Sequence, residues 1–236
     1  MTGGGGDIGR ASAIALARAG ARVHLIGRTV ARLEAAATDI DAVGGQARIH
    51  PVDVTDTAAV QRLFQGSAVD VLVNSAGTNI PQPLDAVRPQ DFDTIFDVNV
   101  RAAFFVTQQA VQAMRHDRRP GSIIMISSQM GHVGGPKRAV YCGSKWAVEG
   151  MTRAMALELA PEQIRINTVA PTFVETAMTR EYLKDPDFKQ FVLGAIPMGA
   201  MAQPADVAAA VLFLAGDGAR MITGTSVRVD GGWTAQ

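Results

Sequence analysis

The chain has a single cysteine, Cys142, among its 236 residues. One cysteine excludes an intrachain disulfide framework and disfavours a structural zinc site, and the four histidines are scattered at positions 24, 50, 116 and 132. We therefore expect a reducing, cytoplasmic setting and no metal site.

Long apolar runs and an excess of one charge are also absent. No window approaches the roughly 18 continuous apolar residues of a membrane span, and the opening MTGGGG is not a charged and apolar leader. Lys+Arg and Asp+Glu both total 22, so the formal net charge is zero and no long run of one sign occurs. This balance indicates neither nucleic acid nor a membrane surface as a partner. We expect a small molecule instead.

What the chain does have is an alternation of two hydrophobic periods. Short apolar, β-branched runs predict buried strands at 22–26, 47–52, 69–74, 121–127, 165–170 and 226–230. Apolar residues at 3.6 spacing predict helices at 8–19, 29–43, 56–65, 91–116, 140–160 and 204–215. This order predicts an α/β fold, a doubly wound parallel sheet with helices on both faces, in one domain over 1–236. The segment 172–203 fits least well, and we interpret it as a lid over a pocket.

The spacing of Tyr141, Lys145 and Ser128 indicates acid–base chemistry. On a helix, an i,i+4 spacing places the phenol and the ammonium on one face. A phenol with a pKa of about 10 must fall by roughly 3 units, about 4 kcal/mol, to exchange protons readily at neutral pH, and a neighbouring cation supplies part of that. Ser128 follows an apolar strand and can bond a substrate oxygen. The alternative is a surface pair and a local turn serine.

The glycine-rich opening, residues 2–9, predicts a phosphate cradle. Glycines let the backbone approach a pyrophosphate, and the following helix offers free N–H groups; a plain tight turn is the alternative. Asp7 stands where a small residue is expected, either as a helix N-cap or as a charge that weakens phosphate binding. Only Met1 and Thr2 precede Gly3, so the strand that should run into this loop is missing, and we expect a late start position or a trimmed chain.

Eight pieces of the chain, in order, resemble the short-chain dehydrogenase/reductase family. They are TGGGGDIG, Asp53-Val54, NSAG (74–77), Asn99, Ser128, YCGSK (141–145), the stretch 165–176 and the ending 223–233. The resemblance covers essentially the whole chain and implies a Rossmann-like sheet of seven strands. Asp7 replaces the second glycine of the family's TGxxxGxG pattern.

The resemblance also implies roles for the candidate catalytic residues. Tyr141 is expected to be the general acid in reduction and the base in oxidation, with Lys145 lowering its pKa and binding the nicotinamide ribose. Ser128 is expected to position the substrate oxygen. Asn99 is expected to interrupt a helix and hold a water of the proton relay. Without the resemblance, the simpler interpretation is an ordinary polar residue whose hydrogen bonds are made within the fold.

The cofactor implied is NADP(H), with NAD(H) as the alternative. Arg28 follows the first predicted strand, where an NAD site would place an acid, and a guanidinium can bind a ribose 2′-phosphate. Arg28 could instead be a solvated loop residue. The family resemblance adds a set of cofactor-binding residues: Gly3, Gly6, Asp7, Ile8, Arg28, Asp53, Val54, Asn74, Ala76, Gly77, Tyr141, Lys145, Pro171, Val174 and Thr176.

The predicted function is hydride transfer between this cofactor and a secondary alcohol or ketone, with Tyr141 as general acid/base. The alternative is a cofactor-impaired, non-catalytic binding or scaffold protein, for which Asp7 and the missing strand are the reasons. We expect Met178 and Tyr182 to close the pocket and His132 to be structural rather than catalytic. The family commonly forms homotetramers or dimers through the helices at 91–116 and 140–160.

Overall fold

The computed structural model describes residues 1–236 except for the side chain of Met178, which lies outside the described part of the chain. Its strands all run parallel and match the predicted ones to within a few residues. They are β1 (Arg22–Gly27), β2 (Gln46–Pro51), β3 (Val71–Asn74), β4 (Gly121–Ile126), β5 (Ile164–Pro171) and β6 (Ser226–Val229). β1 pairs with β2, and the remaining strands are ordered β3-β4-β5-β6.

Met1 and Thr2 lie between these two groups of strands. Thr2 bridges Ile26 of β1 and Asn74 of β3 in parallel register, with its N–H 3.0 Å from the Val73 carbonyl oxygen. In the described part of the chain no further strand separates β1 from β3, as the short opening predicts. The glycine-rich segment starts immediately after this bridge, at the carboxyl ends of both neighbouring strands.

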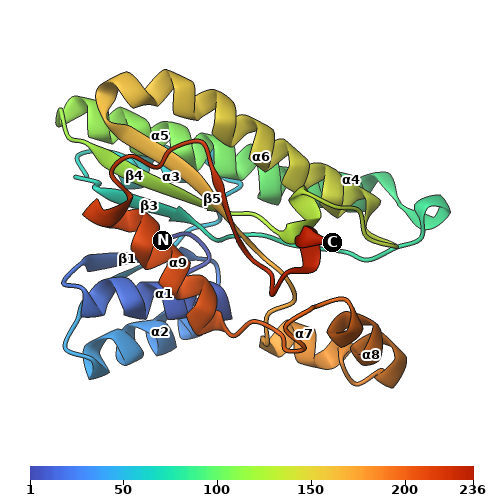
Figure 1. The fold of residues 1–236 in the computed structure, drawn as a ribbon. Helices are drawn as coiled ribbons and strands as arrows, with labels where there is room; N and C mark the ends of the chain where they lie inside the picture. The colour runs from blue at the N-terminus through green and yellow to red at the C-terminus, as the bar shows by residue number, and fades with distance from the viewer.

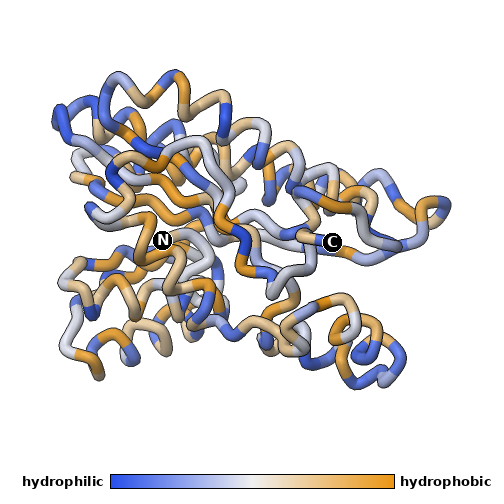
Figure 2. The backbone as a smooth tube through the Cα atoms, viewed as in Figure 1, coloured by the Kyte–Doolittle hydropathy of each residue, from blue (hydrophilic) through white to orange (hydrophobic). Residues whose placement is uncertain are grey.

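Helices cover both faces of the sheet (Figure 1). One face carries α1 (Asp7–Arg18), α2 (Val30–Ala42) and α9 (Pro204–Ala215); the other carries α3 (Thr57–Phe64), α5 (Ala103–His116) and α6 (Ala139–Leu159). Successive strand residues face opposite cores: Val73 and Ile124 pack with the first layer, and Leu72 and Ile123 with the second. Burial on both faces explains why the strands are nearly continuous apolar runs, which Figure 2 shows between the helix layers.

The helix predicted at 91–116 is interrupted. It consists of α4 (Pro89–Phe96), a π-helical segment from Asp97 to Ala102, and α5. Asn99 lies in the π-helical segment and is buried. A π-helical turn inside an α-helix is often found at functional sites. None of the helices in the described structure is both long enough and apolar enough to span a membrane.

The segment interpreted as a lid forms two short helices, α7 (Ala177–Tyr182) and α8 (Pro186–Gly194). Thr176 caps α7 by accepting a hydrogen bond from the Thr179 N–H at 3.2 Å, and Asp185 caps α8 through the N–H groups of Asp187 and Phe188. In Figure 1 both helices stand apart from the sheet, at the end where α9 begins.

Candidate active site

A cleft of about 800 Å³ lies at the carboxyl ends of the strands. Its walls come from the glycine-rich segment, the starts of α1 and α2, the ends of β3, β4 and β5, the first turns of α6, and α7. This is where open parallel sheets bind ligands. The predicted lid helix α7 therefore does border the cleft.

The glycine-rich segment is packed too tightly for side chains. Gly3 has φ of +62°, and a Cβ there would lie 2.8 Å from the Ala76 nitrogen. A Cβ on Gly9 would collide with the Gly3 carbonyl oxygen. α1 begins at Asp7, directly after this turn, so the amides of its first turn have no partners within the helix and border the cleft. A bare backbone beside a helix N-terminus fits the pyrophosphate of a dinucleotide.

Asp7 does not cap α1, so its predicted role as an N-cap is wrong. The N-cap is Gly6, and Asp7 is the first residue of the helix, without a capping side-chain bond. Its carboxylate instead accepts a hydrogen bond from the backbone N–H of Ala177, with 2.7 Å between Oδ2 and N. Asp7 therefore joins the glycine-rich segment to the start of the lid helix α7.

Tyr141 and Lys145 occupy successive turns of α6, as their spacing predicts. The Lys145 side chain is buried, its Nζ lies 5.6 Å from the centroid of the Tyr141 ring, and it donates a hydrogen bond of 2.9 Å to the Ile126 carbonyl oxygen. Burial lowers the pKa of Lys145 to about 8, while the charge of Glu149 opposes this change. A lysine with this pKa exchanges protons near neutral pH.

The pKa of the Tyr141 phenol is raised, whereas the sequence predicted that the neighbouring Lys145 lowers it. Burial raises the pKa of Tyr141, against the opposing effects of a hydrogen bond with Ser128 and the charge of Arg138. Desolvation disfavours the phenolate, and in the chain alone it outweighs the neighbouring groups.

Ser128 lies at the end of β4, facing the cleft. Its hydroxyl accepts a hydrogen bond from the Met130 N–H at 3.2 Å and lies 3.2 Å from the Gln129 Oε1. The local turn bond considered as the alternative is thus present, and Ser128 also lowers the pKa of Tyr141, against the larger effect of burial. The turn bond and a contact of Ser128 with the substrate oxygen are therefore compatible.

Asn99 connects the loop after β3 with the helix that carries Tyr141 and Lys145. Its Oδ1 accepts from the Thr78 N–H at 2.8 Å, and its Nδ2 donates to the Thr78 carbonyl at 2.9 Å and to the Ser144 Oγ at 3.0 Å. A Cβ on Gly77 would lie 3.4 Å from Asn99 Oδ1 and 3.8 Å from Lys145 Nζ. Ser128, Tyr141 and Lys145 therefore line the cleft, and the buried Asn99 lies behind them, bonded to Ser144.

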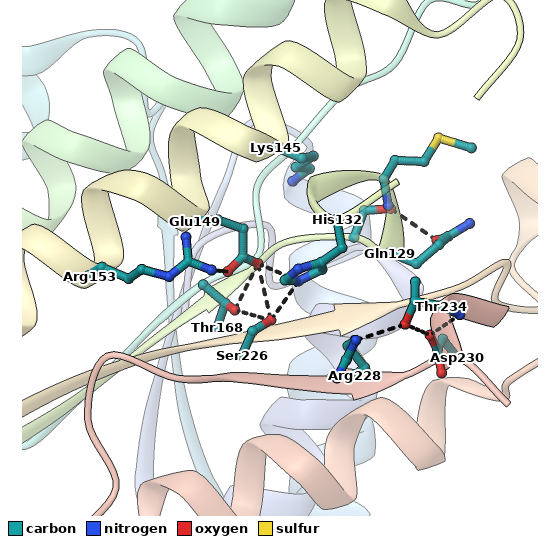
Figure 3. Close-up of polar contacts among 12 residues, drawn as sticks. Gln129, His132, Lys145, Glu149, Arg153, Thr168, Ser226, Arg228, Asp230 and Thr234 are labelled. Carbon is teal, nitrogen blue, oxygen red and sulfur yellow. Dashed lines mark hydrogen bonds and ion pairs between the residues drawn. The ribbon is translucent and has the colours of Figure 1, made fainter. Parts of the chain in front are cut away.

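Beneath this group lies a buried polar network around Glu149 (Figure 3). One carboxylate oxygen, Oε1, accepts from Thr168 Oγ1 at 2.9 Å and Ser226 Oγ at 3.2 Å, and lies 3.3 Å from His132 Nε2. The same nitrogen of His132 is 2.9 Å from Ser226 Oγ. His132 is thus hydrogen-bonded within the structure, as predicted, and does not line the cleft.

The predicted cofactor residues divide into two groups. Gly3, Gly6, Asp7, Ile8, Gly77, Tyr141, Lys145, Pro171, Val174 and Thr176 line the cleft; Arg28, Asp53, Val54, Asn74 and Ala76 do not. The Asn74 amide donates to Thr107 Oγ1 at 2.9 Å, which anchors β3 to α5. Arg28 is 77% exposed and lies 3.8 Å from Asp53.

Three arginines that line the cleft were missed from the sequence, Arg10, Arg32 and Arg138, and Arg10 is paired with Asp39. Arg32 is in the first turn of α2, and a Cβ on Gly5 would lie 2.8 Å from its Cβ. It follows Arg28 by one helical turn, and that spacing could have revealed it. Arg138 directly precedes α6, three positions before Tyr141.

A parallel sheet with a glycine-rich turn and a Tyr–Lys–Ser–Asn group at its carboxyl edge is typical of nicotinamide-dependent oxidoreductases. A family model described as enoyl-(acyl carrier protein) reductase matches residues 5–234. The chain is 38% identical over 234 residues to L-xylulose reductase of Mesocricetus auratus, covering 99% of this chain and 94% of that protein. It is also 38% identical over 240 residues to cyclopentanol dehydrogenase of Comamonas sp. (strain NCIMB 9872), covering 100% and 96%.

Among solved structures, gluconate 5-dehydrogenase from Burkholderia cenocepacia J2315, in complex with NADP and tartrate, superimposes with a TM-score of 0.94 at 31% identity, covering 100% of this chain and 94% of that one. The chain belongs to the short-chain dehydrogenase/reductase family. It is an NAD(P)-dependent dehydrogenase/reductase that acts on CH–OH groups.

Proposed function

We propose that residues 1–236 form a single catalytic domain that transfers hydride between NADP(H) and a secondary alcohol or ketone, with Tyr141 as general acid/base. The observation that carries this proposal is that Tyr141, Lys145 and Ser128 line the same cleft as the glycine-rich segment, with Asn99 bonded behind them to Ser144. A bound nicotinamide supplies the hydride in reduction and takes it in oxidation.

In reduction, the Tyr141 hydroxyl donates its proton to the substrate oxygen, and Ser128 Oγ donates a hydrogen bond to the same atom. Both donors act where negative charge develops as the carbonyl becomes an alcohol. Lys145 stabilises the phenolate that Tyr141 becomes when it has donated its proton. Asn99 fixes the loop at Thr78 and the backbone of α6 relative to one another, so it holds the pair in position.

The choice of NADP(H) rests on Arg28 and Arg32. Arg28 lies between β1 and α2, Arg32 lies in the first turn of α2 against Gly5, and no acid stands at the end of β1 to bind both ribose hydroxyls. Two guanidinium groups offer charge-assisted hydrogen bonds to a 2′-phosphate. NAD(H) is the second candidate, because Arg28 lies near Asp53, whose charge offsets part of its own.

The substrate class follows the names of the relatives, which are reductases and dehydrogenases of sugars, sugar acids and a cyclic alcohol. The compartment and the homo-oligomeric state stay predictions. Exposed apolar side chains on the helices expected at the interface, Phe104 on α5 and Trp146 and Leu157 on α6, support an oligomer.

The test is a fluorescence titration with NADPH and NADH, followed by turnover assays with a panel of ketones, sugars and hydroxysteroids. We expect NADPH to bind more tightly and at least one ketone to be reduced. Failure to bind either cofactor would instead favour the non-catalytic scaffold protein.

A further inference from the structure

Arg138 is a buried cation that has no counter-ion in the described structure. Its residue is 8% exposed, its Nη1 is inaccessible to solvent, and that nitrogen has no hydrogen-bond partner among the described residues. The ionisable groups around it are the phenols of Tyr141 and Tyr182 and the thiol of Cys142, and none of them is a carboxylate. No carboxylate of the described chain lies within ion-pair distance of it.

A buried arginine without a counter-ion lowers the stability of the fold unless an anion binds beside it. A guanidinium keeps its charge in proteins, so Arg138 cannot avoid the penalty of burial by losing a proton. A buried charge without a partner destabilises a fold, and a buried donor without an acceptor adds to that cost. Burial lowers the pKa of Arg138, because removal from water disfavours the charged form.

The position of Arg138 relates this missing anion to the substrate. Arg138 lines the cleft together with Ser128, Gln129, Tyr141 and Tyr182 of α7. It is the N-cap residue of α6 and precedes Tyr141 by three positions, which is a rise of about 4.5 Å along the helix axis. An anionic group bound there is a few bonds away from an oxygen held by Tyr141 and Ser128.

The rest of the lining is consistent with an anionic ligand. The only carboxylate among the described cleft residues is that of Asp7, whose Oδ2 already accepts from the Ala177 N–H at 2.7 Å. A planar guanidinium matches a carboxylate by two parallel hydrogen bonds. The glycine-rich segment packs against Arg32 of α2, whereas Arg138 lies at the start of α6 and packs against Gly135, so the cofactor phosphates do not explain Arg138.

We propose that Arg138 binds a carboxylate of the substrate, and that the enzyme acts on small hydroxy acids and oxo acids rather than on neutral alcohols and ketones. This inference rests on the proposed hydride-transfer function. It adds a specificity-determining residue and the chemical class of the substrate.

The experiment compares each acid with its uncharged amide. The wild-type enzyme, Arg138→Met and Arg138→Lys are assayed with NADP⁺ on aliphatic 2-, 3- and 4-hydroxy acids and hexonic acids, each beside the matching amide. We expect the wild type to prefer the acid, and Arg138→Met to lose about 100-fold in kcat/KM on the acid, mainly through KM, as for one charged hydrogen-bonded pair. On the amide Arg138→Met should lose much less than on the acid, because only the acid loses its charge partner, whereas any effect of Arg138 on Tyr141 applies to both compounds alike.

Lys137→Met is the matched control, because it removes the neighbouring exposed cation, which does not line the cleft. It should leave the preference for acids unchanged. Arg138→Lys keeps the positive charge but cannot form two parallel hydrogen bonds to a carboxylate. It should retain the preference for acids with a higher KM, and it provides the test if Arg138→Met does not fold.

Equal use of acid and amide by the wild type, or an equal loss on both in Arg138→Met, overturns the carboxylate site and leaves hydride transfer intact. Where no compound is turned over although NADPH binds, the proposed function fails. Calorimetric titration of the same acids into the NADP⁺ complex then decides the carboxylate site: binding abolished by Arg138→Met supports it, and equal or absent binding overturns it.

Discussion

The Asp7 carboxylate and the Ala177 backbone N–H, 170 positions apart in the chain, form a hydrogen bond of 2.7 Å between two residues that line the cleft. Asp7 is the first residue of α1 and Ala177 the first residue of α7. One bond therefore connects the segment expected to hold the cofactor phosphates with the helix expected to close over them. Opening the cleft at this end requires that the bond break.

We predict that Asp7→Asn binds NADPH about two- to fivefold more tightly than the wild type. The amide oxygen of asparagine can still accept from Ala177, while the negative charge beside the start of α1 is removed, and a charge near a helix N-terminus is worth about 0.3–1 kcal/mol. Fluorescence titration measures the difference. Unchanged or weaker binding would mean that the carboxylate does not oppose the phosphates.

Asp7→Ala removes both the charge and the hydrogen-bond acceptor of Ala177, whereas Asp7→Asn removes only the charge, so a comparison of the two variants separates these effects. Amide hydrogen exchange in α7 should be faster in Asp7→Ala than in Asp7→Asn, because only the alanine variant lacks the acceptor for Ala177. Equal exchange in the two variants would show that the hydrogen bond does not hold the helix.

Sequence periodicity was sufficient for the strands and most helices, because a parallel sheet buried on both faces requires apolar runs of that length. The side-by-side arrangement of Tyr141 and Lys145 also follows from local geometry. The partner of Asp7 does not, because it comes from a segment 170 positions away. For the same reason, the absence of a counter-ion around Arg138 could be seen only once all neighbouring elements were packed around it.

The pKa of Tyr141 likewise depends on tertiary packing that could not be predicted from the sequence. Spacing identified the cation beside the phenol but gave no measure of burial, and burial moves the pKa in the opposite direction. Asn74 is a related case, since its motif predicted a place at the cofactor while its amide bonds Thr107.

Tyr141→Phe should abolish turnover while retaining cofactor binding. The substitution removes the hydroxyl that transfers the proton and keeps the ring against Lys145, and a positioned general acid contributes about 10²–10⁴-fold to rate. Steady-state kinetics with a substrate of the wild type, next to an NADPH titration, measures both quantities. A variant with nearly wild-type rates would rule out the role of Tyr141, and loss of NADPH binding would indicate a structural defect.

Arg28→Ala and Arg32→Ala should each weaken NADPH binding by about tenfold and leave NADH binding nearly unchanged. A charged hydrogen bond to the 2′-phosphate contributes about 1.5–3 kcal/mol, and part of it is screened at these exposed positions. Parallel titrations with the two cofactors measure the ratio. Arg62→Ala, on α3, is the control for loss of one positive charge. An equal effect on both cofactors would contradict contact with the 2′-phosphate.

Glu149→Gln should shift the alkaline limb of the pH profile of kcat/KM to lower pH. Lys145, with a pKa of about 8, is a cation below that pH and neutral above it, and the charge of Glu149 raises this pKa. Removing that charge destabilises the cation, so Lys145 loses its proton at lower pH and the activity that depends on the cation falls earlier.

Glutamine keeps an oxygen that can accept from Thr168 and Ser226, so the buried network around position 149 retains those bonds. Arg153→Gln is the matched control, since it removes the exposed cation 3.9 Å from Glu149 but leaves the carboxylate in place, and its alkaline limb should stay at the wild-type position. A profile of Glu149→Gln that coincides with the wild type would show that the carboxylate does not act on Lys145. A uniform loss of activity at every pH would indicate a packing defect instead, because a change in the charge of Lys145 must move the limb and not only the plateau.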